Sequence, residues 1–139
     1  MSDYQLIEKP PELADFIRFR EIVGWGNADL KTTQISIQNT LYWVQVIKED
    51  EMIACGRIIG DGGGIYYYIQ DVIVHPDHRG KSLGDKMMQA IMIYIRKNAA
   101  KGAFIGLMAA KGVDDFYLKY GFKKRPSSQY GSGMCLSIR

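Results

Sequence analysis

Residues that form disulfides, metal sites and proton relays are scarce, because the 139-residue chain has only two cysteines and two histidines. Cys55 and Cys135 both lie in apolar runs, which favours buried thiols in a reducing compartment over a disulfide or a catalytic thiol. The chain also lacks a run of about 18 apolar residues and a basic-then-apolar signal at its start. We therefore expect a cytoplasmic protein with no membrane partner.

A strong excess of one charge is absent as well. The chain has 18 Lys and Arg against 15 Asp and Glu, a net charge of +3, and the basic residues are scattered. This balance gives little support to a nucleic-acid partner but suits a small polyanionic ligand. With 47% hydrophobic residues, the chain suits one domain spanning residues 1–139.

The hydrophobic periods predict a mixed α/β (α+β) domain, in which a central sheet of about six or seven strands is flanked by about four helices. Leu13, Phe16, Phe19 and Arg20 lie on one side of the first predicted helix, which follows Pro10-Pro11. The predicted strands are 4–7, 41–47, 52–59, 65–74, 103–108, one that begins at Phe122, and 134–138. The predicted helices run from Pro11 to about Val23, over 33–39 with Thr32 or Thr33 as cap, from near Leu83 for about 15 residues until residues 98–102 end it, and over 112–120.

The stretch from His75 to Gly84 organises the chain, because it joins an apolar strand to a long amphipathic helix. The first amides of a helix lack intrahelical acceptors and lie at the positive end of the helix dipole, so such a turn can bind phosphate. Gly80 and Gly84 allow close backbone approach, and Ser82 is a suitable N-cap residue if its backbone is not left-handed. The sequence therefore predicts an anion-binding turn over these residues.

Two phosphate-binding motifs could explain this turn. Gly80-Lys81-Ser82 matches the end of a Walker A loop, but that loop needs a glycine where this chain has His75. The other motif is Arg/Gln-x-x-Gly/Ala-x-Gly/Ala after a strand, which Arg79 to Gly84 matches with Ser82 at the central glycine position. This second match resembles motif A of the GNAT superfamily of acyl-coenzyme A dependent N-acyltransferases.

A second segment strengthens the resemblance. Residues 115–122 are similar to the Phe-Tyr-x-x-x-Gly-Phe segment of motif B, with Gly121 suited to the end of a helix. Two departures are Ala110, where relatives often have asparagine, and Gln70, where many have a glutamate base. Together the two motifs cover the C-terminal two-thirds of the chain in the family's order.

The resemblance implies the roles of individual residues. Tyr117 would protonate the leaving thiolate of coenzyme A, and Asp71 would accept the proton of the amine or, equally well, bind a substrate cation or cap a turn. Trp25, Asp29 and Gln70 would contact the acceptor, although Trp25 could equally fill the core. The expected acetyl-coenzyme A contacts are Val72, Ile73, Val74, Arg79, Gly80, Lys81, Ser82, Leu83, Gly84 and Asp85.

These roles predict direct transfer of an acetyl group from acetyl-coenzyme A, as co-substrate, to a primary amine of a small molecule, with no metal. The alternative is a module of the same fold that binds acyl-coenzyme A or a protein without turnover. A homodimer stays open, as do two roles for residues 123–133: a loop that closes over the acceptor, or a solvated hairpin.

Overall fold

The computed structural model describes residues 3–138. The chain divides into two compact units, Met1–Leu107 and Met108–Arg139. The first unit holds the whole sheet and the second contains one short helix.

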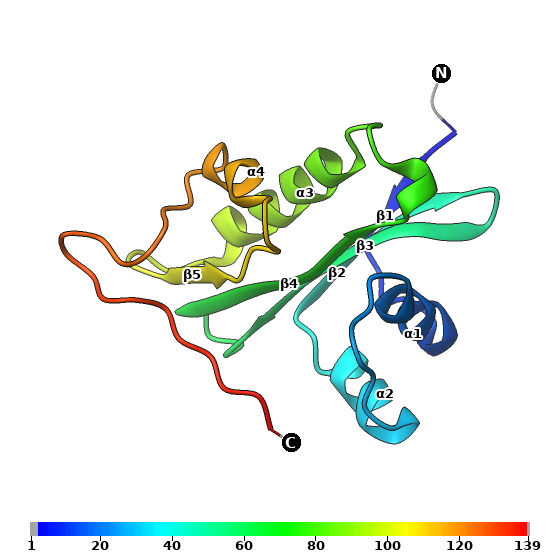
Figure 1. Ribbon diagram of the computed structural model, residues 1–139, viewed down its shortest axis with the longest axis horizontal. Coiled ribbons are helices and arrows are strands. Elements are labelled where there is room, and N and C mark those ends of the chain that lie inside the picture. Colours follow the sequence, from blue (N-terminus) through cyan, green and yellow to red (C-terminus); the bar gives the residue numbers. More distant parts are fainter. Residues whose placement is uncertain (1–2, 139) are drawn as a thin grey trace. The chain divides into compact units, whose positions relative to one another are not determined.

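The first unit is a five-stranded sheet in the order β1-β2-β3-β4-β5 (Figure 1). The neighbours are antiparallel except β5, which runs parallel to β4 after the helical crossover expected from the sequence. The strands are β1 (Gln5–Ile7), β2 (Tyr42–Lys48), β3 (Glu51–Gly60), β4 (Tyr66–Val74) and β5 (Phe104–Leu107). The mixed α+β fold is confirmed, but the described residues form five strands and not six or seven.

Two helices cover one face of the sheet and one helix covers the other (Figure 1). Phe19 of α1 (Leu13–Ile22) packs on Cys55 and Ile73, whereas a side chain at the neighbouring Gly56 would contact Ile91 of α3 (Leu83–Asn98). Successive strand residues face opposite sides, so α1 and α3 lie on opposite faces. Among residues 3–138, no helix has both the length and the apolar character needed to cross a bilayer.

The two hairpin turns form where the sequence predicts them. Glu49 and Asp50 both have positive φ, 52° and 62°, which is the backbone of a two-residue turn between antiparallel strands. At the next turn, the carboxylate of Asp61 accepts hydrogen bonds from the amides of Gly63 and Gly64. These contacts explain why the glycine run is a turn and not a ligand loop.

The second helix begins earlier than predicted. It spans Leu30–Gln38 as α2, and its cap is Asp29, whose carboxylate accepts from the amide of Thr32 at 2.8 Å and from its hydroxyl at 2.9 Å. These hydrogen bonds lower the pKa of Asp29. The expectation of a threonine cap was wrong because aspartate three residues before Thr32 reaches the free amides of the first turn.

The second unit contains less regular structure than predicted. Its helix α4 covers only Asp114–Leu118, and residues 119–138 form neither helix nor strand. Gly121 has the expected positive φ, 94°, and its amide bonds to the carbonyl of Leu118. The predicted strands at Phe122 and over 134–138 are wrong, because in the described residues these segments have no neighbouring strand and most of their side chains are exposed.

The cysteines differ in exposure, contrary to the expectation that both are buried. Burial raises the pKa of Cys55, and the nearby Asp71 carboxylate adds to this rise. Because the thiolate is the reactive form, we expect a thiol reagent to modify Cys135 of the folded protein rapidly and Cys55 slowly.

Titration with a disulfide reagent that releases a coloured thiolate checks this. One thiol should react quickly in buffer and the second only in denaturant, and Cys135→Ser should remove the fast phase. Two fast phases in the folded protein would contradict the burial of Cys55.

Candidate active site

An irregularity in the pairing of β3 with β4 positions the side chain of Asp71. Cys55 pairs with Ile73 and Arg57 with Gln70, so Asp71 and Val72 together lie opposite the single residue between Cys55 and Arg57. Asp71 takes a positive φ of 53°, a conformation that aspartate tolerates better than most residues. This β-bulge directs the Asp71 carboxylate to the face that α1 covers.

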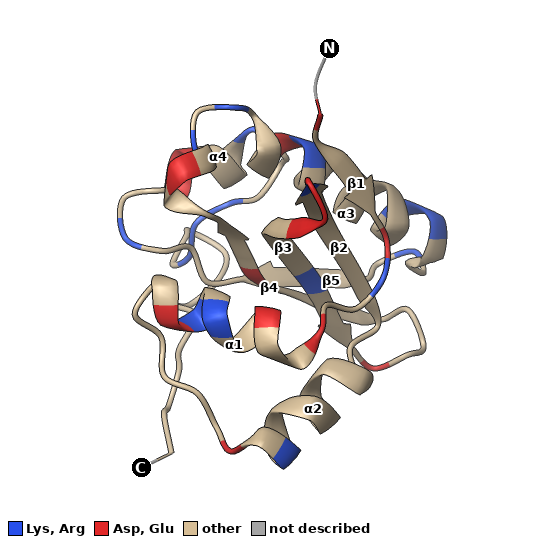
Figure 2. Ribbon diagram, turned by 90° about the vertical axis from the view of Figure 1, so that its right-hand side faces the viewer, with Lys and Arg blue, Asp and Glu red and all other residues tan. Residues whose placement is uncertain are grey.

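Three side chains then form a buried ion-pair cluster, which we call the Arg-Asp-Arg cluster: Arg20 of α1, Arg57 of β3 and Asp71 of β4. Arg57 Nε lies 2.8 Å from one Asp71 oxygen and Arg20 Nη1 lies 3.0 Å from the other. The exposed fractions of the side chains are 0% for Asp71, 8% for Arg57 and 24% for Arg20. The charged positions on α1, β3 and β4 can be followed in Figure 2.

Further hydrogen bonds tie the cluster to neighbouring segments. Arg57 Nη1 donates to the hydroxyls of Ser36 in α2 and Thr40, at 3.1 and 3.0 Å. Arg20 donates from Nε and Nη2 to the carbonyl of Gly26, at 3.0 and 2.7 Å. The cluster therefore links both helices of this face to the bulge.

The enclosure of Asp71 argues against its expected role as a general base or a cation-binding group. Both of its oxygens accept from guanidinium groups, and Gln70 Nε2 lies 3.3 Å from one of them. A general base or a cation-binding carboxylate must reach the proton or cation concerned. A carboxylate with no exposed surface and two bound arginines is placed instead to hold those arginines.

The structure brings two of the three expected acceptor contacts to this cluster. Trp25 is 37% exposed, so it does not fill the core, and its ring centroid lies 5.7 Å from the Arg20 guanidinium. Gln70 is half-buried beside Asp71. Asp29 instead uses its carboxylate to cap α2.

Sequence reasoning missed the two arginines as site residues, although the pattern contained a signal. Arg20 lies on the apolar face of its helix and Arg57 inside an apolar strand, and an arginine is rarely buried without a partner. Asp71, the acidic residue inside the next strand, is that partner.

The turn predicted to bind an anion follows β4. A short 3-10 turn, Pro76–His78, leads to Gly80, whose φ is 80° and where an added Cβ would meet no atom within 4 Å. In α3 the first intrahelical amide bond runs from Lys86 to Ser82, so the amides of Leu83 and Gly84 have no acceptor within the helix. Arg79 and Lys81 are exposed beside them.

Ser82 precedes α3 at the N-cap position, but its side chain makes no capping hydrogen bond. Its φ of 60° and ψ of 25° are left-handed, which corrects the expectation of a conformation that serine adopts without cost. A left-handed serine costs about 1–2 kcal/mol. Leu83 is buried, so at that residue only the backbone amide could meet a ligand.

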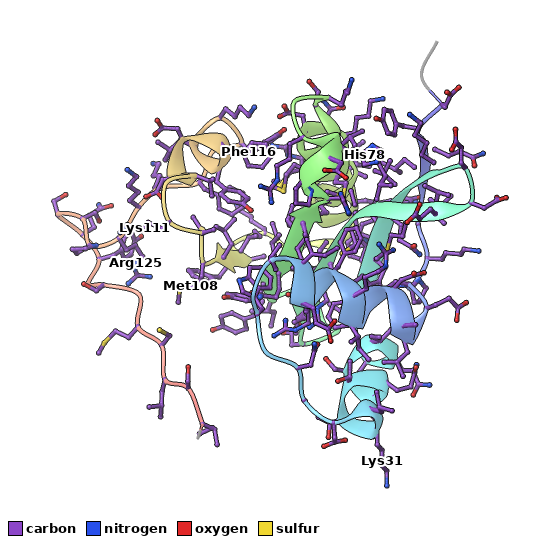
Figure 3. All side chains as sticks on the ribbon, turned by 45° about the vertical axis from the view of Figure 1, so that its right-hand side comes forward. Lys31, His78, Met108, Lys111, Phe116 and Arg125 are labelled. Carbon is purple, nitrogen blue, oxygen red and sulfur yellow. The ribbon has the colours of Figure 1, made fainter. Side chains whose placement is uncertain are left out.

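The two histidines of the turn have protein partners. His78 Nδ1 lies 3.1 Å from the Tyr4 hydroxyl, and His75 Nδ1 accepts from the Asp77 amide at 3.1 Å. His78 lies at the turn between β4 and α3 (Figure 3). Both side chains thus support the turn.

The second half of β4 has a strand on one side only. β5 pairs with Tyr66 to Ile69, and beyond Ile69 this same edge of β4 has no paired strand among the described residues, while the opposite edge stays paired with β3. Backbone groups on the unpaired edge from Gln70 to Val74 can therefore bind an extended ligand. Ile73 turns its side chain into the core, so it would contribute backbone alone.

Tyr117 lies in α4 of the second unit and is half-buried. Its ring packs edge-on against Phe116 and Phe122, with centroid distances of 5.0 and 6.3 Å, and Phe116 marks this helix in Figure 3. Burial raises the pKa of Tyr117, which keeps its hydroxyl protonated at neutral pH.

A family model described as an acetyltransferase (GNAT) domain matches residues 38–124 of this chain. The chain belongs to the GNAT family. The match spans both motifs found in the sequence.

Known proteins agree with this assignment. The chain is 30% identical over 113 residues to an uncharacterized N-acetyltransferase, ycf52, of Porphyra purpurea, covering 78% of this chain and 63% of that protein. The chain thus spans less than two thirds of this relative. Among solved structures, a probable acetyltransferase of Staphylococcus aureus is 27% identical with a TM-score of 0.85, covering 97% of this chain and 99% of that one.

A GNAT family acetyltransferase of Streptococcus pneumoniae is 22% identical with a TM-score of 0.79, covering 98% of each chain. At this identity, the likeness shows the fold alone.

Proposed function

We propose that this protein transfers an acetyl group from acetyl-coenzyme A to a primary amine of a small molecule. The observation that carries the proposal is the anion-binding turn at the start of α3, directly after a strand whose second half has one open edge. Such a pair can hold the diphosphate and the extended arm of one ligand. The open space at Gly80 fits a ligand that approaches the backbone closely.

Each residue group then has a role in the transfer. The amides of Leu83 and Gly84, with Gly80 and the charges of Arg79 and Lys81, would hold the diphosphate. The backbone of residues 72–74 would hold the arm and polarise the thioester carbonyl, because fixed dipoles need no reorganisation.

The reaction itself forms a C–N bond between amine and acetyl carbon and breaks the C–S bond of the thioester. Tyr117 would give its phenolic proton to the departing sulfur, whose thiolate resembles a cysteine thiolate with a pKa of about 8.5. The phenol is protonated at neutral pH, which supports this role.

The proton of the amine needs another path. An amine with a pKa near 10 is almost wholly protonated at pH 7, and freeing its lone pair costs about 4 kcal/mol. Asp71 is enclosed, so we assign it to holding Arg20 and Arg57, and water to accepting the proton. A positive charge close to the amine lowers the pKa of that amine, and Arg20 is the partly exposed charge of the cluster.

A panel of amines, amino acids, amino sugars and polyamines, assayed for release of coenzyme A, tests the proposal. At least one acceptor should release thiol in proportion to protein and yield an acetylated product by mass spectrometry. If calorimetry shows that acetyl-coenzyme A binds while no acceptor reacts, the non-catalytic binding module is the correct alternative. If acetyl-coenzyme A does not bind, both are wrong.

A matched pair of variants at Gly80 tests the anion-binding turn. Asn and Asp have nearly the same shape and both tolerate a positive φ, so Gly80→Asn and Gly80→Asp differ mainly in charge. We expect the Asp variant to bind acetyl-coenzyme A about tenfold to a hundredfold more weakly than the Asn variant, because a carboxylate repels the diphosphate. Calorimetry at low salt measures the difference, and equal affinities would place the diphosphate elsewhere.

A further inference from the structure

The Arg-Asp-Arg cluster presents positive charge to an incoming molecule. It contains two guanidinium groups and one carboxylate, and the carboxylate has no exposed surface. Arg57 is nearly enclosed as well, whereas Arg20 keeps 24% of its side chain exposed. A ligand that reaches the cluster therefore meets the surplus cation at Arg20.

The neighbouring acidic residues do not neutralise the positive charge of Arg20. Asp29 directs its carboxylate to Thr32, and Asp15 pairs with Arg18 at 3.3 Å. Glu21 follows Arg20 on the helix and so points about 100° away from it. Asp71 is shared between two arginines.

Arg20 also has unused donors in a fixed orientation. A guanidinium carries five N–H bonds, and three of those of Arg20 go to Asp71 and the carbonyl of Gly26. Within the described residues, this leaves two donors. The guanidinium carbon also lies 5.7 Å from the ring centroid of Trp25 and 5.8 Å from that of Phe16.

The location relates this group to the proposed reaction. Arg20 bonds to the bulge residue Asp71, and the open edge of β4, which begins at Gln70, contains that bulge. Under the proposed function, the thioester lies along residues 72–74, so Arg20 lies close to where the acceptor must approach.

We infer that Arg20 binds an anionic group of the acceptor, so that the preferred substrates are small amines carrying a carboxylate or a phosphate. The part of this inference that concerns the substrate rests on the proposed function, whereas the binding of an anion at Arg20 does not. A guanidinium with two free donors binds either anion with charge-assisted hydrogen bonds, and Trp25 forms one wall of the site.

Matched acceptors test the substrate class. Glycine is compared with glycinamide for the carboxylate, and glucosamine 6-phosphate with glucosamine for the phosphate, each rate being expressed per deprotonated amine. We expect kcat/KM for the anionic member of at least one pair to exceed that of its neutral partner by about tenfold or more. Arg20→Gln should remove the preference, mainly through KM, and Arg20→Lys should keep part of it.

Arg18→Gln is the matched control, because Arg18 lies on the same helix, pairs with Asp15 outside the Arg-Asp-Arg cluster and should leave the preference unchanged. Circular dichroism establishes whether each variant is folded. Equal kcat/KM within both pairs would overturn the inference while leaving the acetyltransferase proposal intact.

A second measurement on the unaltered chain uses no turnover. Acetate and inorganic phosphate are titrated into nitrogen-15 labelled protein, and the side-chain resonances of Arg20 Nε and of both tryptophan indoles are followed. The anions should shift Arg20 and Trp25 but not Trp43, which is buried, and Trp25→Phe assigns the peaks.

If these shifts occur while no acceptor releases coenzyme A, the anion site stands and the proposed function fails. If neither anion shifts Arg20 and Trp25, the inference is wrong.

Discussion

Replacing Asp71 with alanine is expected to destabilise the protein by about 3–5 kcal/mol, because it leaves the buried Arg57 and the partly exposed Arg20 without their shared carboxylate. Such a loss is a large part of the total stability of a domain of this size. Urea unfolding followed by circular dichroism measures it.

Comparing two substitutions at Asp71 separates the loss of its charge from the strain of its backbone. Asparagine tolerates the positive φ of Asp71, so Asp71→Asn removes the charge and keeps the backbone, whereas alanine adds strain. We therefore expect Asp71→Ala to be less stable than Asp71→Asn. Asp15→Ala is the control, since Asp15 pairs with Arg18 at the surface and should cost less than about 1 kcal/mol. A cost for Asp71→Ala as small as that of the control would show that the cluster is not needed for folding.

Replacing Tyr117 with phenylalanine is expected to slow coenzyme A release by about a hundredfold to ten-thousandfold, the range of general acid catalysis. The ring contacts with Phe116 and Phe122 remain, and within residues 3–138 the hydroxyl has no hydrogen-bond partner to lose. The fold and the affinity for acetyl-coenzyme A should therefore be kept. Thiol release and calorimetry measure the two quantities.

The pH dependence follows from the sign of the shift. The pKa of Tyr117 is raised, so its proton is present at neutral pH and leaves only above the ordinary value of about 10. The rate should not fall between pH 7 and 9 through this group. Tyr130→Phe is the control, because Tyr130 is exposed and lies in the same unit. An undiminished rate in Tyr117→Phe would remove Tyr117 from the reaction.

The order of elements was predictable because it depends on local patterns. The periodic apolar residues of 83–98 gave the bounds of α3 within a residue, and the polar turns at 48–51 and 61–64 gave two hairpins. The start of α2 was missed because its apolar pattern is weak and Asp29 was considered only as a ligand contact. The strand predicted at 134–138 is absent because a strand needs a paired neighbour, and a local sequence pattern does not provide one.

The sequence alone determined the family and located the turn expected to bind an anion, because both depend on residues that are neighbours in the chain: a strand, two glycines, two basic residues and a helix start. Only the tertiary structure decided the partners of Asp71. Its partners are 51 and 14 residues away in the chain, and the bulge that turns its side chain to them exists only when β3 and β4 are paired. Charge pairing across such distances depends on packing, and local sequence patterns do not contain it.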